Sequence, residues 1–556
     1  MVNALIEIWN KSSNAKLFTT VFLLVFIPPY IFMLDYPELA PFKFFANDSF
    51  YYFNLIKNSH AVNFYSYDGV YPTNGFHPIW GNILFFLNEL NILDISNKVE
   101  FLKRVFILNL FILSLATSIF ALFSTKYFTN KWWTIVMFAP GISGILLSPI
   151  AADYLTTWSY VNGMETAIAL LFFSISLMFY SHRNKNYIFL FLAVLFMGLT
   201  VLSRLDEIFF FISFFVLLMI NSKPHRRIYT FAYFIPPALL ILGYLAYNQL
   251  TVGILMPISG WEKSGFSILG NLKIIIKLFL PIYSWDYPNV LRESHVLYST
   301  YTELFMRMFQ LIVPLVIAII YLGYYYYKLS KTIRFSILHA LVLGVILKAL
   351  YNLIFVGIWR QGSWYFGSSI FITNLLLTVG LSIIFESLFH KKHKIVLIIK
   401  HWGVLIYIVM STMLFNNYIN NKLHGNYGDT SFKLFKEKEN IKTFIRENNI
   451  NKFVEFEDGI LAFVTDIPSI GGLGPILDLE ASVARKNGKF LELLNDRGYE
   501  LIIASKDYGL VINDYIDNKR LAKLGLWGIK SSEFQNYSIN KYVEDDNVMY
   551  YLLKQI

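Results

Sequence analysis

The chain has 556 residues, of which 56% are hydrophobic and 15% are charged, and its formal net charge is +10. Its mean hydropathy of +0.50 excludes an ordinary soluble protein and indicates a polytopic membrane protein. The basic residues form short clusters between apolar runs, a pattern that sets membrane topology, so we expect no nucleic-acid partner. The sequence contains no cysteine, which excludes disulfides, thiolate metal ligands and cysteine nucleophiles.

Apolar runs of membrane-spanning length recur along the chain and predict about eleven transmembrane helices. The first run lacks a small-residue cleavage site, so we expect it to remain as a signal anchor. Clusters of Lys and Arg fall at every second junction, which predicts a cytoplasmic N-terminus and an outward-facing C-terminus. The predicted spans are 17–34, 104–124, 132–150, 161–181, 187–203, 207–221, 229–249, 303–325, 336–358, 367–388 and 397–416.

A polar and aromatic stretch, NDSFYYFNLIKNSHAVNFYSYDGVYPTNGFHPIW, follows the first span and runs from Asn47 to Trp80. Within and just after it, residues 49–58 and 77–92 are too short or too polar to span, and they predict helices lying in the membrane interface. Asp48 precedes the first of these helices. There its carboxylate has two interpretations, as a cap on the helix N-terminus or as a general base that takes a proton from a bound hydroxyl.

The end of this stretch predicts a rigid turn, because two prolines flank an Asn-Gly pair. Asn74 and His77 belong to the turn, and Tyr51 lies in the helix that follows Asp48. His77 and Asp48 are candidate metal ligands, but one His and one Asp without ligand spacing give a weak metal signal. We therefore expect that no cofactor is required, and a divalent ion bound through Asp48 is the alternative.

Further polar residues fall at outward-facing junctions. The turn 203–207 places Arg204 beside Asp206 at the edge of the hydrocarbon, where internal ion pairing is the default interpretation. The alternative is phosphate binding by Arg204, with Asp206 fixing the guanidinium group. Glu165 starts a predicted helix, where its charge favours the positive helix N-terminus.

Two later outward loops add cations and aromatic residues. Lys263 follows a Pro-Ile-Ser-Gly-Trp-Glu sequence, and Arg360 precedes Trp364 and Tyr365. Trp and Tyr at such positions usually belong to the interfacial aromatic belt. Several cations, an outward carboxylate and aromatic loops together predict a site for a lipid that carries a phosphate, reached from within the bilayer.

The composition changes near Asn417 to that of a soluble domain. We expect a membrane domain over 1–416 and a soluble extracytoplasmic α/β domain over 417–556. The glycines of SIGGLGPILDLE suggest a phosphate loop, but no Lys-Ser/Thr pair follows, so we expect no phosphate binding there. The predicted strands are 452–456, 460–464 and 501–505, and the predicted helices are 432–447, 478–495 and 510–522.

The stretch from Asn47 to Trp80 resembles the first outer loop of bacterial GT-C membrane glycosyltransferases, a superfamily that includes protein O-mannosyltransferases and lipid A aminoarabinose transferases. Its acidic-aromatic start, NDSFYY, and its end, TNGFHPIW, carry the resemblance. It extends over about 47–370, because further matches follow in order: NGMETAIALL at 162–171, LSRLDEIFFF at 202–211, Asn248 with GILMPISGWEK at 253–263, and SWYF at 363–366.

The resemblance implies an inverting transfer of a sugar from a polyprenyl-phosphate donor to a glycolipid, polysaccharide or protein acceptor. The reaction would take place on the outer face of a bacterial inner membrane, with Asp48 as the base. Many relatives carry two adjacent acids here, whereas this chain has Asn47 at the first position. The resemblance also implies phosphate contacts by Arg204, Lys263 and Arg360, with supporting roles for Tyr51, Asn74, His77, Glu165, Asp206, Trp364 and Tyr365.

The alternative function is a transporter or flippase of polyprenyl-linked sugars. Alternating access commonly uses inverted repeats and broken helices near the midplane of the membrane. We find no such internal repeat, and the polar residues fall on one predicted face. The glycosyltransferase is therefore the favoured hypothesis.

Overall fold

The structure is a computed structural model, and its chain divides into two compact units. Unit 1 comprises residues 1–36, 106–241 and 265–425, and unit 2 comprises residues 37–105, 242–264 and 426–556. The structure describes residues 14–59, 62, 64–128, 132–138, 160–263, 265, 268–269, 271, 312–324, 336–356, 363–389, 423, 429–455, 459–471, 477–505, 537–544 and 548–555.

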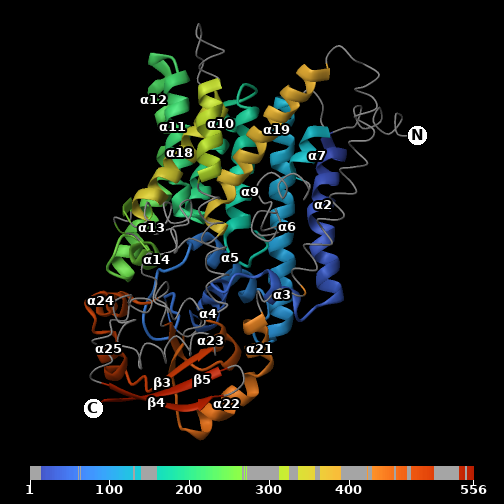
Figure 1. Ribbon diagram of the computed structural model, residues 1–556. Helices are drawn as coiled ribbons and strands as arrows, with labels where there is room; N and C mark the ends of the chain where they lie inside the picture. The colour runs from blue at the N-terminus through green and yellow to red at the C-terminus, as the bar shows by residue number, and fades with distance from the viewer. Residues whose placement is uncertain are drawn as a thin grey trace, which may run out of the picture. The chain divides into compact units, whose positions relative to one another are not determined.

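Unit 1 is helical in its described part (Figure 1). Short 3-10 helices lie at its turns: η1 (Thr125–Tyr127), η3 (Leu205–Glu207), η4 (Pro224–Arg226) and η6 (Ser363–Phe366). The α-helices that lie wholly or partly in it are α2 (Asn14–Asp35), α6 (Lys98–Ser124), α7 (Trp132–Phe138), α9 (Thr166–Ser181), α10 (Tyr187–Ser203), α11 (Ile208–Asn221), α12 (Arg227–Ala232), α13 (Ile235–Thr251), α18 (Ile337–Phe355) and α19 (Gly367–Phe389).

Four of the described helices are long and apolar enough to cross a membrane, so the chain is an integral membrane protein. They are Asn14–Asp35, Lys98–Tyr127, Ile337–Phe355 and Gly367–Ile384, and the bent pair Pro224–Ala232 with Ile235–Thr251 raises the number to five. Ten of the eleven predicted spans contain a described helix, which in the span 303–325 is the shorter apolar helix Ile312–Tyr324. The eleventh, 397–416, lies outside the described residues, so the count of eleven stays a prediction.

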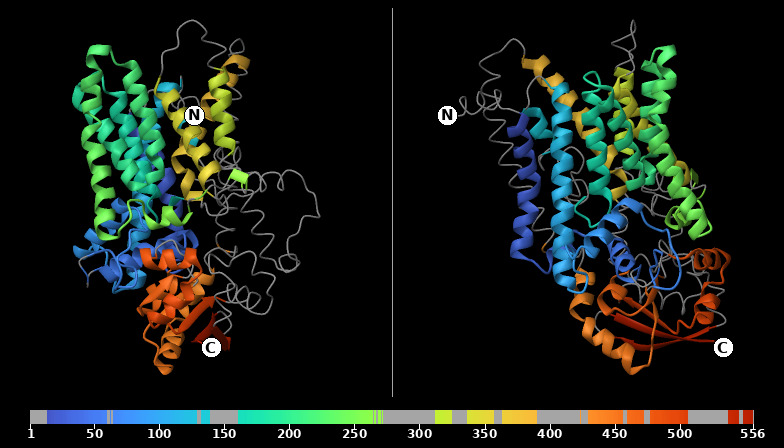
Figure 2. Two further views of the ribbon diagram at one scale, coloured as in Figure 1. Left: turned by 90° about the vertical axis from the view of Figure 1, so that its left-hand side faces the viewer. Right: turned by 180° about the vertical axis from the view of Figure 1, so that it is seen from behind.

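Helices α9, α10, α11 and α18 pack side by side in unit 1 (Figures 1 and 2). The α9–α10 hairpin is closed by Ser176 Oγ, which donates to the carbonyl of Ala193 at 2.6 Å, and Asn186 caps α10 through the amide of Ile188. Where α18 approaches α11, a Cβ at Gly344 would overlap the ring of Phe210. These small and polar residues permit the close approach that helices need to pack within a membrane.

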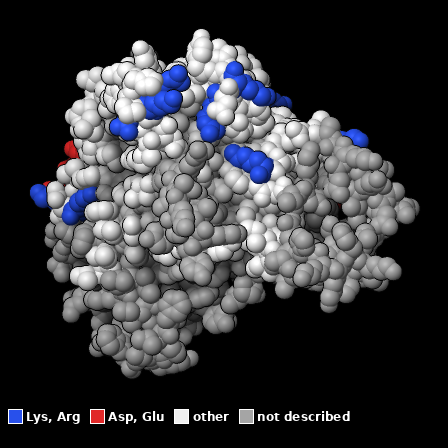
Figure 3. Space-filling view, turned by 90° about the horizontal axis from the view of Figure 1, so that it is seen from above, with Lys and Arg blue, Asp and Glu red and all other residues white. Residues whose placement is uncertain are grey.

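Basic side chains gather at one end of unit 1 (Figure 3). The turns that join α9 to α10 and α11 to α12 lie at this end, and they contain Arg183, Lys185, Lys223 and Arg226. The turn with Arg204 lies at the other end of the same antiparallel helices (Figure 1). The segregation fits the predicted alternation of basic clusters, and the side of the membrane on which each end lies stays a prediction.

Unit 2 brings together three separate parts of the chain. Its five-stranded sheet has the order β2-β1-β3-β5-β4, in which β2, β1 and β3 are parallel and β5 is antiparallel to both β3 and β4. The strands are β1 (Phe453–Glu455), β2 (Ser469–Gly471), β3 (Leu501–Ser505), β4 (Tyr537–Glu544) and β5 (Val548–Gln555). The helices are α3 (Ala40–Phe44), α4 (Ser49–Ser59), α5 (Pro78–Glu89), α14 (Ile258–Lys263), α21 (Asp429–Lys436), α22 (Lys438–Glu447), α23 (Ile460–Thr465), α24 (Leu479–Asn487) and α25 (Phe490–Asp496), with the adjoining ends of α6 and α13.

The core of unit 2 lies between the sheet and helices α24 and α25. Val454, Ile502 and Tyr551 come from adjacent strands and pack on Phe490 and Leu494 of α25. The sheet and its helices occupy the predicted α/β region, but the compact unit also takes in residues 37–105 and 242–264. The predicted division at 416/417, and the solubility and outward position of the C-terminal part, stay predictions.

The predicted strand at 460–464 is wrong, because these residues form helix α23. All of them are buried, so the run has neither the alternation of a half-buried strand nor the polar face of an exposed helix. Gly459 starts the helix at φ +91°, and Glu455 accepts hydrogen bonds from the first amides of the helix, those of Leu461 and Ala462. A side chain from outside the run therefore decides its conformation.

Other predicted elements of this region are confirmed in part. Strands 452–456 and 501–505 contain β1 and β3, while β2, β4 and β5 were not predicted. The predicted helices 432–447 and 478–495 each form two shorter helices, α21 with α22 and α24 with α25. The predicted helix at 510–522 lies outside the described residues.

Helix α4 confirms the prediction of a helix at 49–58, but the expected interfacial position is wrong for it. Residues 49–56 are all buried inside unit 2, so α4 has no apolar face left for lipid. Helix α5 differs, because it exposes the large apolar side chain of Phe86. The burial of α4 makes it a core element of the unit.

Candidate functional site

Asp48 lies at the N-terminal end of α4 and is partly exposed. Its carbonyl accepts a hydrogen bond from the amide of Tyr51 at 3.3 Å, and the carbonyl of Asn47 accepts one from Phe50 at 3.0 Å, which begins the helix. Asn47 Oδ1 accepts a hydrogen bond from Ser431 Oγ of α21 at 3.2 Å. The backbone around Asp48 is thus held on one side by the helix it starts and on the other by the C-terminal residues.

Helix α4 packs against α23 through aromatic rings. The centroid of the Phe463 ring lies 5.5 Å from that of Phe50 and 5.7 Å from that of Phe53. Asn54 Nδ2 donates to the carbonyl of Gly459 at 2.7 Å, and Lys57 Nζ donates to that of Ala462 at 2.7 Å. Burial lowers the pKa of Lys57 to about 8, because the charged ammonium is removed from water.

Tyr67 and Glu455 form a buried pair that sequence reasoning did not find. Glu455 is fully buried at the end of β1, and its Oε1 accepts hydrogen bonds from the hydroxyls of Tyr67 and Ser469. The ring of Tyr67 meets that of Tyr51 of α4 edge to face, with centroids 5.9 Å apart. A charged residue in the apolar sequence KFVEF was the available signal, since a buried carboxylate needs partners.

The predicted turn at 71–78 contacts two other segments of unit 2. Asn74 Oδ1 accepts a hydrogen bond from the amide of Ile258 at 3.0 Å, and its Nδ2 donates to the carbonyl of Met256 at 3.4 Å. Thr73 Oγ1 donates to the carbonyl of Leu477 at 2.9 Å. His77 precedes α5, and its amide donates to the hydroxyl of Tyr52 at 3.2 Å. Asn74 therefore fastens the turn to residues 256–258, and His77 stands at the start of α5.

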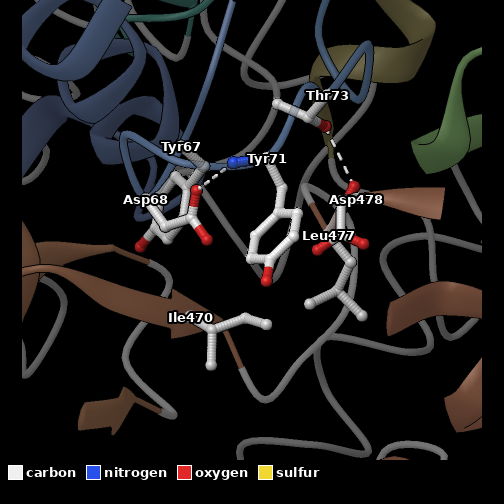
Figure 4. Close-up of a pocket in the computed structure, with 7 residues that line it drawn as sticks. All are labelled: Tyr67, Asp68, Tyr71, Thr73, Ile470, Leu477 and Asp478. Carbon is white, nitrogen blue, oxygen red and sulfur yellow. Dashed lines mark hydrogen bonds between the residues drawn. The ribbon is translucent and has the colours of Figure 1, made fainter. Parts of the chain in front are cut away.

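A small cavity of about 10 Å³ lies beside this turn (Figure 4). Asp68 lines it, and its Oδ1 accepts hydrogen bonds from the amides of Val70 and Tyr71, each at 2.9 Å. The volume suits a single water molecule and excludes a sugar. The residues that line it are Tyr67, Asp68, Tyr71, Thr73, Ile470, Leu477 and Asp478.

Arg497 braces the wall of the cavity. Its guanidinium donates to both carboxylate oxygens of Asp478, at 2.6 and 3.0 Å, and lies 3.7 Å from the centroid of the Tyr71 ring. Such a bidentate pair is among the stronger and more directional ion pairs in proteins. It joins the start of α24 to the first outer loop.

In unit 1, Arg204 is 2% exposed and lies between two carboxylates. Its Nη1 donates to Glu165 Oε1 at 2.7 Å and its Nε donates to Asp206 Oδ1 at 3.0 Å. The guanidinium carbon lies 4.6 Å from the centroid of the Tyr365 ring. The internal ion pairing expected by default is present, and Asp206 fixes the guanidinium as predicted. The phosphate contact stays a prediction.

Lys348 is a second buried cation in this network and was missed by sequence reasoning. It lies on α18, is 1% exposed, and its Nζ is 2.7 Å from Glu207 Oε1 and 2.9 Å from Asp206 Oδ2. Ser368 Oγ also donates to Glu207 at 2.7 Å. A lysine within the apolar run 336–358 was the available signal, because a cation at membrane depth requires a partner.

The remaining predicted residues are only partly placed. Lys263 is the last residue of α14, and Trp364 belongs to η6. Arg360 lies outside the described residues. Tyr51 is buried in α4. No group of three His, Asp or Glu side chains that would hold a metal ion occurs among the described residues.

No protein-family model and no curated protein sequence matches the chain. Solved structures do match. ArnT from Cupriavidus metallidurans bound to undecaprenyl phosphate aligns with a TM-score of 0.50 and 12% identity, over 97% of this chain and 97% of that chain. The same protein in the apo state aligns with a TM-score of 0.50 and 11% identity, over 94% of this chain and 97% of that chain. The archaeal oligosaccharyltransferase AglB from Archaeoglobus fulgidus, in complex with an inhibitory peptide and a dolichol-phosphate, aligns with a TM-score of 0.48 and 11% identity. This alignment covers 98% of this chain and 74% of that chain.

The likeness to both ArnT structures extends over nearly the whole length of each chain. It therefore includes the outer loops and the C-terminal part as well as the membrane helices. At 11–12% identity such a likeness establishes a fold. The chain therefore has the fold of ArnT, one of the kinds of enzyme that the sequence from Asn47 to Trp80 resembles.

Proposed function

We propose that the protein is an inverting glycosyltransferase that moves a sugar from a polyprenyl-phosphate donor to an acceptor hydroxyl or amine outside the cytoplasm. The observation that carries the proposal is the likeness to ArnT, solved with undecaprenyl phosphate, over 97% of both chains. The sequence match from Asn47 to Trp80 supports it independently.

Asp48 is the proposed base. The acceptor attacks the anomeric carbon, Asp48 takes the proton of the acceptor, and the bond from that carbon to the phosphate oxygen breaks, which releases polyprenyl phosphate. Asp48 is proposed over its neighbour because the side-chain amide of Asn47, which accepts a hydrogen bond from Ser431, cannot act as a general base. The partial exposure of Asp48 leaves it accessible to a substrate.

The leaving phosphate needs positive charge, for which Arg204, Lys263 and Arg360 are the proposed donors. Arg204 is paired with both Glu165 and Asp206, so we propose that these carboxylates hold its guanidinium group in a fixed orientation. The proposed reaction balances its charge without a metal, and a divalent ion bound through Asp48 is the alternative.

Turnover in vesicles that contain polyprenyl-phosphate sugars tests the proposal. Asp48→Asn should lower kcat by about 100-fold or more, the lower end of the usual effect of a general base. Asp94→Asn is the matched control, because Asp94 is an exposed carboxylate of the same outer segment that pairs with Ser96. Full turnover in Asp48→Asn would exclude Asp48 as the base, and transport of the lipid without glycosidic bond formation would exclude the transferase.

A further inference from the structure

The C-terminal residues approach α4 closely at Gly459. Its φ of +91° favours glycine, and a Cβ there would lie 3.0 Å from Asn54 Nδ2, 3.1 Å from the Tyr67 hydroxyl and 3.2 Å from the carbonyl carbon of Phe50. A side chain is therefore excluded at 459 for both conformational and steric reasons. The backbone of the C-terminal part thus touches the helix two residues beyond Asp48.

Glu455 connects this contact to the sheet. Its Oε2 accepts the amides of Leu461 at 3.0 Å and Ala462 at 3.2 Å, which orients α23. Its Oε1 accepts the Ser469 hydroxyl at 2.7 Å from β2 and the Tyr67 hydroxyl from the first outer loop. One buried carboxylate therefore joins two strands, the helix that packs on α4, and the loop that follows α4.

The hydrogen bond from Ser431 to Asn47 is a second anchor on the opposite side of Asp48. The ring of Phe42 reinforces this anchor, because it packs on Phe432 and Phe435 of α21 with centroids 5.5 and 5.1 Å away. Asp48 thus lies in a short segment whose two ends are both attached to residues nearly 400 positions later in the chain.

We propose that Tyr67 and Glu455 are positioning residues for the reaction, which fix α4 and therefore the carboxylate of Asp48. The proposal rests on the proposed function, and it gives the C-terminal sheet a role in catalysis in addition to any binding of the acceptor. A base displaced by about 1 Å loses on the order of 100-fold in rate, so small movements of α4 matter. Neither residue carries a positive charge for phosphate, so donor binding should not depend on them.

Tyr67→Phe tests the proposal, because it removes one hydroxyl and keeps the ring against Tyr51. Tyr65→Phe is the matched control, since it removes the same group from a tyrosine of the same loop, whose hydroxyl donates to Asn82 of α5 and not to Glu455. Two readouts are needed in the full-length protein. Hydrogen exchange of the α4 amides reports on positioning without any need for turnover, and kcat with the donor KM reports on the reaction.

We expect Tyr67→Phe to speed exchange of the α4 amides at least tenfold and to lower kcat about tenfold, with the donor KM within twofold. Tyr65→Phe should leave both α4 exchange and kcat within twofold. Unchanged α4 exchange in Tyr67→Phe would overturn the positioning role whether or not the protein turns over, and so would an equal loss of kcat in the two variants. If the wild-type protein shows no turnover but Tyr67→Phe still speeds exchange of the α4 amides, the proposed function is refuted. The role of Tyr67 and Glu455 in fixing α4 would then remain supported.

Discussion

The side chain of Asn47 accepts a hydrogen bond from Ser431 at 3.2 Å across 384 positions of sequence. Asn47 directly precedes Asp48, the proposed base, so this contact of its side chain bears on which of the two positions holds the base. A carboxylate oxygen accepts from a hydroxyl as well as an amide oxygen does.

Asn47→Asp should therefore preserve the contact and leave kcat within about twofold of wild type. Ser431→Ala removes the donor and should cost about 1 kcal/mol of stability. The checks are turnover in vesicles and thermal unfolding in detergent. A rise in kcat of tenfold or more in Asn47→Asp would move the base from Asp48 to position 47.

Lys348→Met should destabilise unit 1 strongly. The change leaves the buried Glu207 beside an uncharged side chain and removes one of the two cations that pair with Asp206, and breaking a buried pair in this way costs about 3–5 kcal/mol. The measurement is the thermal midpoint of the purified protein, which should fall by several degrees. Lys185→Met is the control, because Lys185 is exposed in the turn between α9 and α10. Adding Glu207→Gln should restore part of the loss, and no restoration would show that Lys348 acts through packing of its stem.

Gly459→Ala should be more harmful than Gly498→Ala, although both glycines have positive φ, +91° and +71°. A Cβ at 498 meets its nearest neighbour, Lys452 Cε, at 3.5 Å, so only the backbone strain of about 1 kcal/mol applies there. At 459 the new methyl group also presses on α4. We expect Gly459→Ala to lower the thermal midpoint further and to reduce kcat, whereas Gly498→Ala should leave kcat unchanged. Equal effects of the two changes would contradict the close approach of α4 and residue 459.

The stability of unit 2 should depend on pH through Glu455. Burial raises the pKa of this carboxyl, while the hydrogen bonds from Tyr67 and Ser469 lower it, and burial is the larger effect. The folded state therefore binds more protons than the unfolded state as the pH rises from the ordinary pKa to the raised one. The contribution of Glu455 protonation to the stability of unit 2 is complete below the ordinary pKa. It is lost as the pH rises through the raised pKa.

Tyr67→Phe removes a hydrogen bond that lowers the pKa of Glu455. The pH at which unit 2 loses this stability should therefore move upward. Thermal midpoints measured between pH 4 and pH 8 check the shift, and Glu455→Gln provides the reference without the titrating group. If Glu455→Gln retains the wild-type pH profile across this range, another group is responsible.

The helices of unit 1 follow from sequence more readily than the sheet region does. The span predicted at 187–203 coincides with α10, because Asn186 caps its start and the charged Arg204 turn ends it. Residues 460–464 were assigned wrongly because Glu455, which lies outside the run, supplies the hydrogen bonds that make it helical. A buried carboxylate leaves no periodic signal in the residues that it organises.

The candidate site shows the same division. Asp48 and Arg204 are recognisable as charged residues beside apolar runs, and the pairing of Arg204 with Asp206 follows from their separation of two residues. Lys348 and Tyr67 acquire their roles from partners 141 and 388 positions away, Glu207 and Glu455. Pairings at that separation are set by tertiary packing, which one sequence without its homologues does not specify.

The discontinuity of unit 2 has a consequence for biosynthesis. Helix α4 is made early, yet the residues that cover Phe50 and Phe53, Phe463 above all, emerge from the ribosome roughly 400 residues later. Throughout most of translation the nascent first outer loop therefore presents apolar rings without their native cover, which invites chaperones or aggregation. A chain truncated before residue 426 would keep that exposure permanently, so quality control would remove it even though every membrane helix had been inserted.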